Sequence, residues 1–263
     1  GFNMIRKHIK VEPARWYMHC DREGILVWQD LPSPNLPSGH EDFAKKTFQE
    51  ESVRIIEAFR NHPSIIQWIV FNEGWGQFDT ERMTQIVQGV VGQTLVCCAS
   101  WNDADIGDIK DSHSYPDPSC PLDRNRAAVC GEYGGITLKV QGHVWPGGDF
   151  QYTTVETGGD FTVLFNRLAD KIKDYYYYGL NAAVYTQLSD VEIERNGILT
   201  YDRRALKPYS ATGELKAKIE ECINMPRSGV KVQTIISTSQ EHKYKWRYTT
   251  SDDVHRRWFA KEL

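Results

Sequence analysis

Residues 61–73 read NHPSIIQWIVFNE, and this stretch decides the fold. The His-Pro pair at its start closes the preceding segment, because proline disfavours helical backbone in the residue before it. The apolar run from Ile65 to Phe71 then predicts a buried strand that finishes on the polar pair Asn72-Glu73. Barrel and open α/β enzymes place their chemistry at the carboxyl ends of such strands.

A second run has the same form. Residues 127–133 read AAVCGEY, so a short apolar segment again leads to a glutamate, Glu132. Two glutamates at the ends of strands in one domain predict a pair of carboxylates. The best-known task of such a pair is the cleavage of glycosidic bonds.

Composition restricts the class of protein. Of the 263 residues, 40 % are hydrophobic and 25 % charged, which is typical of a globular domain. The net charge of −4 gives no strong basic field, so we expect neither nucleic acid nor an anionic membrane as a partner. No run is apolar and long enough to span a bilayer. The chain does not begin with Met, so the sequence does not indicate a compartment.

The six cysteines form no C-x-x-C pair, and two of them are adjacent, Cys97 and Cys98. This spacing does not fit a zinc site. We expect no metal and no cofactor.

Strand-like and helix-like segments alternate along the chain, which predicts a parallel sheet with helical crossovers. Seven strands are expected before residue 187, whereas a closed barrel needs eight. The predicted class is therefore α/β, a (β/α)8 TIM barrel that lacks its first strand. The expected strands cover residues 1–6, 25–28, 65–71, 95–99, 106–112, 127–129 and 180–186, and the expected helices residues 13–24, 43–59, 83–91, 161–178 and 206–222.

The composition changes near the carboxyl end. Residues 1–225 are expected to form the incomplete barrel, and residues 226–263 a linker and the beginning of a β-rich domain. Two β-like segments, at residues 232–236 and 244–249, lie in this polar tail.

Cleavage of a glycosidic bond needs one carboxyl group that donates a proton and a second, ionised one. Glu73 and Glu132 end the fourth and seventh strands when the absent strand is counted, which predicts that they face each other across the barrel mouth. Asn72 is expected to hydrogen-bond a sugar hydroxyl. Tyr115 ends the strand before that of Glu132, so its hydroxyl is expected to orient the Glu132 carboxylate and to help keep it ionised.

These residues lie in motifs that resemble glycoside hydrolase family 2, the β-galactosidase group. The resemblance covers residues 1 to about 207 and rests on GFNMIR at 1–6, WY at 16–17, CD at 20–21, GILV at 24–27, NHPS at 61–64, NE at 72–73 and EYGG at 132–135. It implies that Glu73 is the general acid/base and Glu132 the nucleophile of a retaining exo-β-glycosidase acting on β-galactoside-like substrates. It also implies a carbohydrate partner and further β-sandwich domains of the same parent chain, of which the tail looks like the beginning.

The chain departs from the family pattern in two places. Large bacterial β-galactosidases have a magnesium-ligand Glu and His after the third strand, where this chain reads DLPSP at 30–34. The metal is therefore not carried over. The Asn-Lys pair with which β-glucuronidases hold the sugar carboxylate has no equivalent here, which argues against a glucuronide-specific enzyme.

Five further side chains are candidates for the substrate pocket, each with an ordinary structural alternative. A histidine near a strand end is as often a structural hydrogen-bonding group as a substrate contact, and an aromatic residue in a loop either stacks on a sugar or covers the core. The candidates are His8, His113, Trp101, Trp145 and Gln187.

Two other functions remain open on the residues alone. The chain could be a catalytically silent fragment or a carbohydrate-binding remnant, because an absent strand leaves two sheet edges unpaired and removes one wall of the pocket. A phosphate-binding barrel lyase or isomerase fits less well, because no glycine-rich loop follows the late strands.

Overall fold

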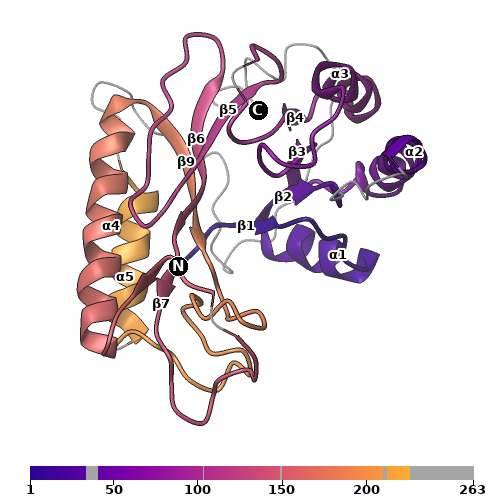
Figure 1. The fold of residues 1–263 in the computed structure, drawn as a ribbon. Coiled ribbons are helices and arrows are strands. Elements are labelled where there is room, and N and C mark those ends of the chain that lie inside the picture. Colours follow the sequence, from indigo (N-terminus) through magenta and orange to yellow (C-terminus); the bar gives the residue numbers. More distant parts are fainter. Residues whose placement is uncertain (34–40, 103, 149, 210–211, 226–263) are drawn as a thin grey trace. The chain divides into compact units, whose positions relative to one another are not determined.

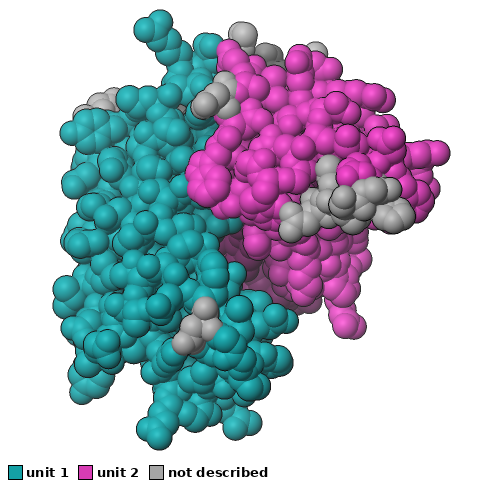
Figure 2. All heavy atoms as spheres, in the orientation of Figure 1, with its two compact units in different colours: residues 1–2, 110–225 teal, residues 3–109, 226–263 magenta. Residues whose placement is uncertain are grey.

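The computed structural model describes residues 1–33, 41–102, 104–148, 150–209 and 212–225. The chain divides into two compact units, which are coloured separately in Figure 2. Unit 1 comprises residues 1–2 and 110–225, and the described part of unit 2 comprises residues within 3–109. Each unit has its own sheet, helices and hydrophobic core.

Unit 2 contains a sheet in the order β1-β2-β3-β4 (Figure 1), and each strand pairs in parallel with the next strand along the chain. Parallel neighbours need a crossover connection, and helices supply it here. The strands are β1 (Met4–Lys7), β2 (Leu26–Asp30), β3 (Ile65–Ile69) and β4 (Leu95–Cys97), and the helices are α1 (Ala14–Glu23), α2 (Glu41–Phe59) and α3 (Thr80–Val91).

The start of β3 is fixed by a polar contact with α1. The Asp21 carboxylate lies 2.6 Å from His62 Nδ1 and accepts a hydrogen bond from the Ser64 backbone N–H at 2.9 Å. From there the apolar side chains enter the core of unit 2, where Trp68 and Phe71 are fully buried. The polar turn and the apolar run of residues 61–71 therefore act together to place this strand.

Unit 1 contains a sheet in the order β5-β6-β9, and β6 and β9 pair in parallel. Helices α4 and α5 belong to this unit (Figure 1). An ion pair between Lys173 and Glu221 joins them. Phe161, Phe165 and Leu168 of α4 pack into the core of the unit. The elements are β5 (Ile109–Ser114), β6 (Ala127–Gly134), β7 (Ile136–Thr137), β8 (Thr153–Thr154), α4 (Gly158–Tyr178), β9 (Leu180–Thr186) and α5 (Thr212–Ile223).

Strands and helices alternate as predicted up to β4, but the five strands from β4 to β8 then follow one another before α4. The pairs β1-β2, β2-β3, β3-β4, β6-β9 and β7-β8 are parallel. All seven expected strands are present, and β7 and β8 form an additional short pair. The fold is therefore mixed α/β with parallel sheets. Closure into a (β/α)8 barrel stays a prediction.

Most boundaries differ from the predicted ones by a few residues, and three of the larger differences have a local cause. The strand expected at 106–112 begins at Ile109, because Gly107 has φ +77° and a side chain there would meet the Val96 carbonyl at 2.7 Å. The strand expected at 127–129 continues past Glu132, because Tyr133 and Gly134 still pair with β9. The helix expected from residue 206 begins only at Thr212, since Pro208 disfavours helix in the residue before it.

Among the helices of the described residues, none has the length and apolar character needed to cross a bilayer. The expected linker and β-rich tail, residues 226–263, lie outside the described residues.

Candidate active site

Glu132 lies on β6 and is largely buried, with 9 % of its surface exposed. The Tyr115 hydroxyl donates a hydrogen bond to Glu132 Oε2. The same hydroxyl lies 3.0 Å from Thr186 Oγ1, at the end of β9. Three strand ends of unit 1 are thus connected through one tyrosine. The hydrogen bond expected between Tyr115 and Glu132 is present.

Burial raises the pKa of Tyr115 well above its ordinary value, and the neighbouring Glu132 charge adds to this shift. The phenol therefore keeps its proton at neutral pH and acts as a donor. A donor directed at a carboxylate stabilises the ionised form of that carboxylate. This arrangement fixes the position of the Glu132 carboxylate.

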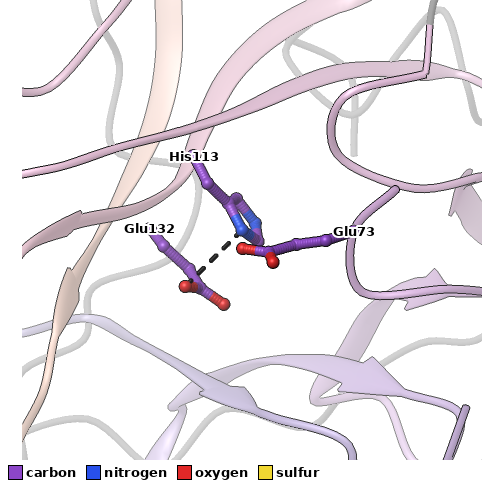
Figure 3. Close-up of side chains that lie close together, drawn as sticks. All are labelled: Glu73, His113 and Glu132. Atoms are coloured by element: carbon purple, nitrogen blue, oxygen red, sulfur yellow. Dashed lines mark ion pairs between the residues drawn. The ribbon is translucent and has the colours of Figure 1, made fainter. Parts of the chain in front are cut away.

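His113 lies between two carboxylates at the end of β5. Its Nδ1 is 3.5 Å from Glu132 Oε2 (dashed line in Figure 3), and its Nε2 is 3.4 Å from Asp111 Oδ2. Carboxylates and imidazoles are also metal ligands. In unit 1, each ring nitrogen of His113 faces a carboxylate oxygen, so the ring is held between Glu132 and Asp111.

Glycines make this packing possible. Asp111 Oδ1 accepts a hydrogen bond from the Gly131 N–H at 2.6 Å, and a Cβ at Gly131 would lie only 2.4 Å from the other oxygen. Gly135 has φ +63°, and a Cβ there would meet the stacked rings of Tyr115 and Tyr152. Those rings lie 3.8 Å apart with an 8° angle between their planes. Gly135 of the EYGG motif therefore leaves room for the tyrosine that holds Glu132, and Gly131, just before the motif, leaves room for Asp111.

Glu73 belongs to unit 2, in the irregular segment that follows β3. It is half-buried. Trp75 Nε1 donates to Glu73 Oε2 at 2.9 Å, and Gln77 Nε2 donates to the Glu73 backbone carbonyl at 2.7 Å. A tryptophan two residues further along the chain thus orients the Glu73 carboxylate.

The neighbouring Asn72 is buried and held from β1 and β2. Arg6 Nη2 donates to Asn72 Oδ1 at 2.7 Å. Arg6 in turn makes a two-point contact with Asp30, through Nε to Oδ1 at 3.0 Å and Nη2 to Oδ2 at 2.8 Å. Because the Asn72 oxygen is engaged, its NH2 group is the one oriented to donate elsewhere.

The other predicted pocket residues are distributed over both units. In unit 2, His8 is exposed beyond the end of β1, and Trp101 is 59 % exposed with φ +54°. In unit 1, Trp145 is 42 % exposed, and its carbonyl accepts from Arg195 Nη2 at 3.0 Å. Gln187 Nε2 donates to Asn196 Oδ1 at 2.6 Å. Their contact with a substrate stays a prediction.

Of the predicted residues, the structure therefore joins Glu132, Tyr115 and His113 in unit 1 and keeps Asn72 beside Glu73 in unit 2. The sequence reasoning missed the residues that hold them: Arg6, Asp30, Trp75, Asp111 and Thr186. A signal existed for Asp30 and Asp111, because each is a charged residue placed among strand residues.

No protein-family model matches the chain. A Formosa agariphila protein named for β-glucuronidase activity is 33 % identical over 82 residues, which is 31 % of this chain and 10 % of that protein. A β-galactosidase of Halalkalibacterium halodurans is 29 % identical over 90 residues, 28 % of this chain and 9 % of that protein.

The fold has relatives among solved structures. A family 2 (GH2) β-galacturonidase from Eisenbergiella tayi, bound to galacturonate, aligns with a TM-score of 0.63 at 15 % identity. The alignment covers 85 % of this chain and 45 % of that one, so the chain spans less than half the length of this structural relative. The two curated relatives and this solved structure all carry the names of glycosidases. The chain is therefore related to glycoside hydrolase family 2, as its sequence motifs indicate.

Proposed function

We propose that this chain carries the catalytic residues of a retaining β-glycosidase, with Glu132 as nucleophile and Glu73 as general acid/base. The observation that carries the proposal is the environment of Glu132: a buried carboxylate that accepts from the protonated Tyr115 hydroxyl and lies beside His113. A carboxylate that is fixed on a strand and accepts a hydrogen bond from a neighbouring donor suits the role of nucleophile toward an anomeric carbon.

The proposed reaction proceeds in two displacements. Glu132 attacks the anomeric carbon while Glu73 gives its proton to the glycosidic oxygen, so the bond to the leaving group breaks and a glycosyl ester forms on Glu132. Glu73, now ionised, takes a proton from water, and that water attacks the same carbon. The ester bond breaks, Glu132 returns to its carboxylate form, and the sugar keeps its original anomeric configuration.

The (β/α)8 barrel expected from the sequence is part of this proposal, with residues 1–225 forming the barrel. Sheets whose strands follow one another in chain order, as β1-β2-β3-β4 do, support it. A barrel brings the carboxyl ends of all its strands to one rim. The segments that follow β3 and end β6 would then both belong to the catalytic face.

The proposed substrate class is a β-galactoside-like sugar. The motifs that resemble the β-galactosidase group support it, and so does the match to a curated β-galactosidase. Other relatives are named for β-glucuronides and galacturonides, so the hydroxyl pattern and carboxylate of the sugar are the features to test.

The test is hydrolysis of a panel of nitrophenyl glycosides by the 263-residue chain. The panel contains β-galactoside, β-mannoside, β-glucosaminide, β-glucuronide and β-galacturonide. We expect turnover of a β-galactoside, release of the β-anomer as the first product by ¹H NMR, and loss of turnover in Glu73→Gln and Glu132→Gln. Glu81→Gln, which removes an exposed carboxylate of α3, is the matched control.

Three outcomes would contradict the proposal. Unchanged rates in both glutamate variants would remove the two carboxylates from the mechanism. Release of the α-anomer first would replace retention by inversion. Binding of sugars without turnover of any substrate in the panel would instead favour the carbohydrate-binding alternative.

A further inference from the structure

Asp30 is a buried carboxylate at the end of β2 that is connected to the ends of two neighbouring strands of the sheet. Its side chain is 1 % exposed, and that of its partner Arg6 is 2 % exposed. Arg6 lies on β1, and Asn72 follows β3. The contacts described above therefore form a continuous hydrogen-bond network from Asp30 through Arg6 to Asn72, entirely within unit 2.

The geometry of this hydrogen-bond network fixes which way each side chain points. Two parallel contacts to Asp30 fix the plane of the Arg6 guanidinium, as is usual for a fork of two donors on a carboxylate. The guanidinium has no freedom to rotate, so its Nη2–H points at Asn72 Oδ1, 2.7 Å away. A fixed donor selects one of the two orientations of the Asn72 amide, namely the one with its oxygen toward Arg6.

Asp30 also holds the segment that follows β1. Its Oδ2 accepts a hydrogen bond from the Ile9 backbone N–H at 3.2 Å. Ile9 has φ +49°, a conformation that is costly for a β-branched residue and needs support from its surroundings. One carboxylate therefore fixes both Asn72 and the backbone next to His8.

We infer that Asp30 is a positioning residue for the substrate-binding Asn72, acting through Arg6. The inference rests on the proposed function and deepens it. Asp30 touches no reacting group itself. It determines that Asn72 presents its NH2 group, a donor, to the sugar, and therefore that the group bound at this position accepts a hydrogen bond, as the hydroxyl next to the reacting carbon does.

Asp30→Asn is the most informative variant. The asparagine keeps the shape of the side chain but offers one acceptor oxygen and an NH2 group, and the NH2 group confronts the Arg6 donors. The fork is broken while the volume is kept. Asp123→Asn is the matched control, because Asp123 also accepts from Nε and Nη2 of an arginine, Arg126, in the segment ahead of β6.

The first readout is a double-mutant cycle in kcat/KM. We expect Asp30→Asn to lower kcat/KM by about 100-fold, because a displaced substrate-positioning group costs about that much. In the Asn72→Ala background, Asp30→Asn should cost less than about threefold, since coupled residues are not additive. Equal losses in both backgrounds would overturn the inference, because Asp30 would then act independently of Asn72. Asp123→Asn should leave kcat/KM unchanged.

The second readout does not depend on activity. The ¹⁵N-bound side-chain signals of Asn72 are identified as the pair that disappears in Asn72→Asp. We expect Asp30→Asn to shift this pair and Asp123→Asn to leave it in place. An unshifted pair would overturn the inference even in an active enzyme, whereas shifted signals in a chain that hydrolyses nothing would uphold the positioning and refute the proposed function alone.

A folding failure is addressed by a second variant. If Asp30→Asn lacks a cooperative thermal transition, Arg6→Lys replaces it. Lysine keeps the positive charge but cannot form the two-point contact, so it should give the same loss in kcat/KM and the same shift of the Asn72 signals. Normal signals and normal kcat/KM in Arg6→Lys would contradict the inference.

Discussion

Glu132 and Glu73 have different surroundings, although both are glutamates that follow buried apolar segments. Glu132 lies within a strand, is nearly buried, and contacts a tyrosine and a histidine from the neighbouring segments. Glu73 lies in an irregular segment after its strand, is half-buried, and is oriented by the indole of Trp75. Glu132 thus contacts side chains from neighbouring segments, and Glu73 accepts a hydrogen bond from a tryptophan of its own segment.

This difference matches the two proposed roles. A nucleophile must stay ionised and keep its distance to the anomeric carbon, which a strand and a fixed donor provide. A general acid/base must exist in both protonation states during one cycle, so a carboxylate with lighter restraint and access to water is suited to it. The two roles can therefore be distinguished by how the reaction rate of each variant depends on the leaving group and on the residues next to each glutamate.

The largest expected effect separates the two glutamates directly. Glu132→Gln should lower kcat by about 10⁴- to 10⁶-fold for every leaving group, because no covalent intermediate can form. Glu73→Gln should lower kcat by about 10²- to 10⁴-fold for a poor leaving group but much less for dinitrophenolate, which needs no proton. Rates on aryl glycosides of graded leaving-group pKa measure this. The same leaving-group dependence in both variants would remove the distinction.

The next largest effect is a loss of stability, expected in the loop that follows Thr186 at the end of β9. Lys207 Nζ lies 2.6 Å from Asp190 Oδ1 and donates to the Arg195 carbonyl at 2.9 Å, and its side chain is fully buried. Burial lowers the pKa of Lys207 and raises that of Asp190, so each ion depends on its partner. Lys207→Met should reduce the free energy of unfolding by about 3–5 kcal/mol, since it leaves an unpaired buried charge.

Urea unfolding measures this loss, with Lys173→Met as the control. Lys173 also contacts two carboxylates, Asp170 and Glu221, but on the surface of α4 and α5. The control should cost no more than about 1 kcal/mol. Equal losses in the two variants would show that the buried pair does not stabilise the Glu132 side of the molecule more than a surface pair does.

A smaller effect is expected at Tyr115. Tyr115→Phe keeps the stacked ring but removes the hydrogen bond to Glu132, and kcat/KM should fall by about 10- to 100-fold, as for a hydrogen bond to a charged group. Tyr17→Phe is the control, because it removes another buried tyrosine hydroxyl, one that donates to Gln29. It should lower stability and leave kcat/KM unchanged. Similar kinetic losses in both would indicate a general packing effect.

The smallest effect is expected beside Glu73. Trp75→Phe removes the indole donor, and because this contact is exposed, kcat should fall only about two- to tenfold. Steady-state kinetics on an aryl glycoside with a poor leaving group measures it. A loss as large as that of Tyr115→Phe would contradict the idea that Glu73 is the less restrained of the two glutamates.

Much of the fold could be predicted from local pattern. The run from Ile65 to Phe71 and the alternation of apolar segments located every expected strand, because burial of parallel strands produces continuous apolar sequence. The bounds of β5 were displaced, because two of its buried residues, Asp111 and His113, are polar and therefore give no apolar pattern. It also missed β7 and β8, which are too short to show one.

The candidate site likewise has a part that could be predicted from the sequence and a part that could not. Glu132 and Tyr115 could be found because each ends or nearly ends an apolar run, and their hydrogen bond follows from neighbouring strands. Arg6, Asp30 and Asp111 could not be assigned partners, because contacts across 24 or 20 positions of the chain depend on the register between strands. Single-sequence reasoning has no access to that register.

The most direct test of the central claim is to trap the intermediate. A dinitrophenyl 2-deoxy-2-fluoro-β-glycoside of the sugar that the chain hydrolyses forms the glycosyl ester quickly and releases it slowly. We predict that peptide mass spectrometry finds one fluorosugar per chain, attached to Glu132 and absent from Glu132→Gln. Attachment to Glu73, or inactivation without any covalent sugar, would contradict the assignment of Glu132 as the nucleophile.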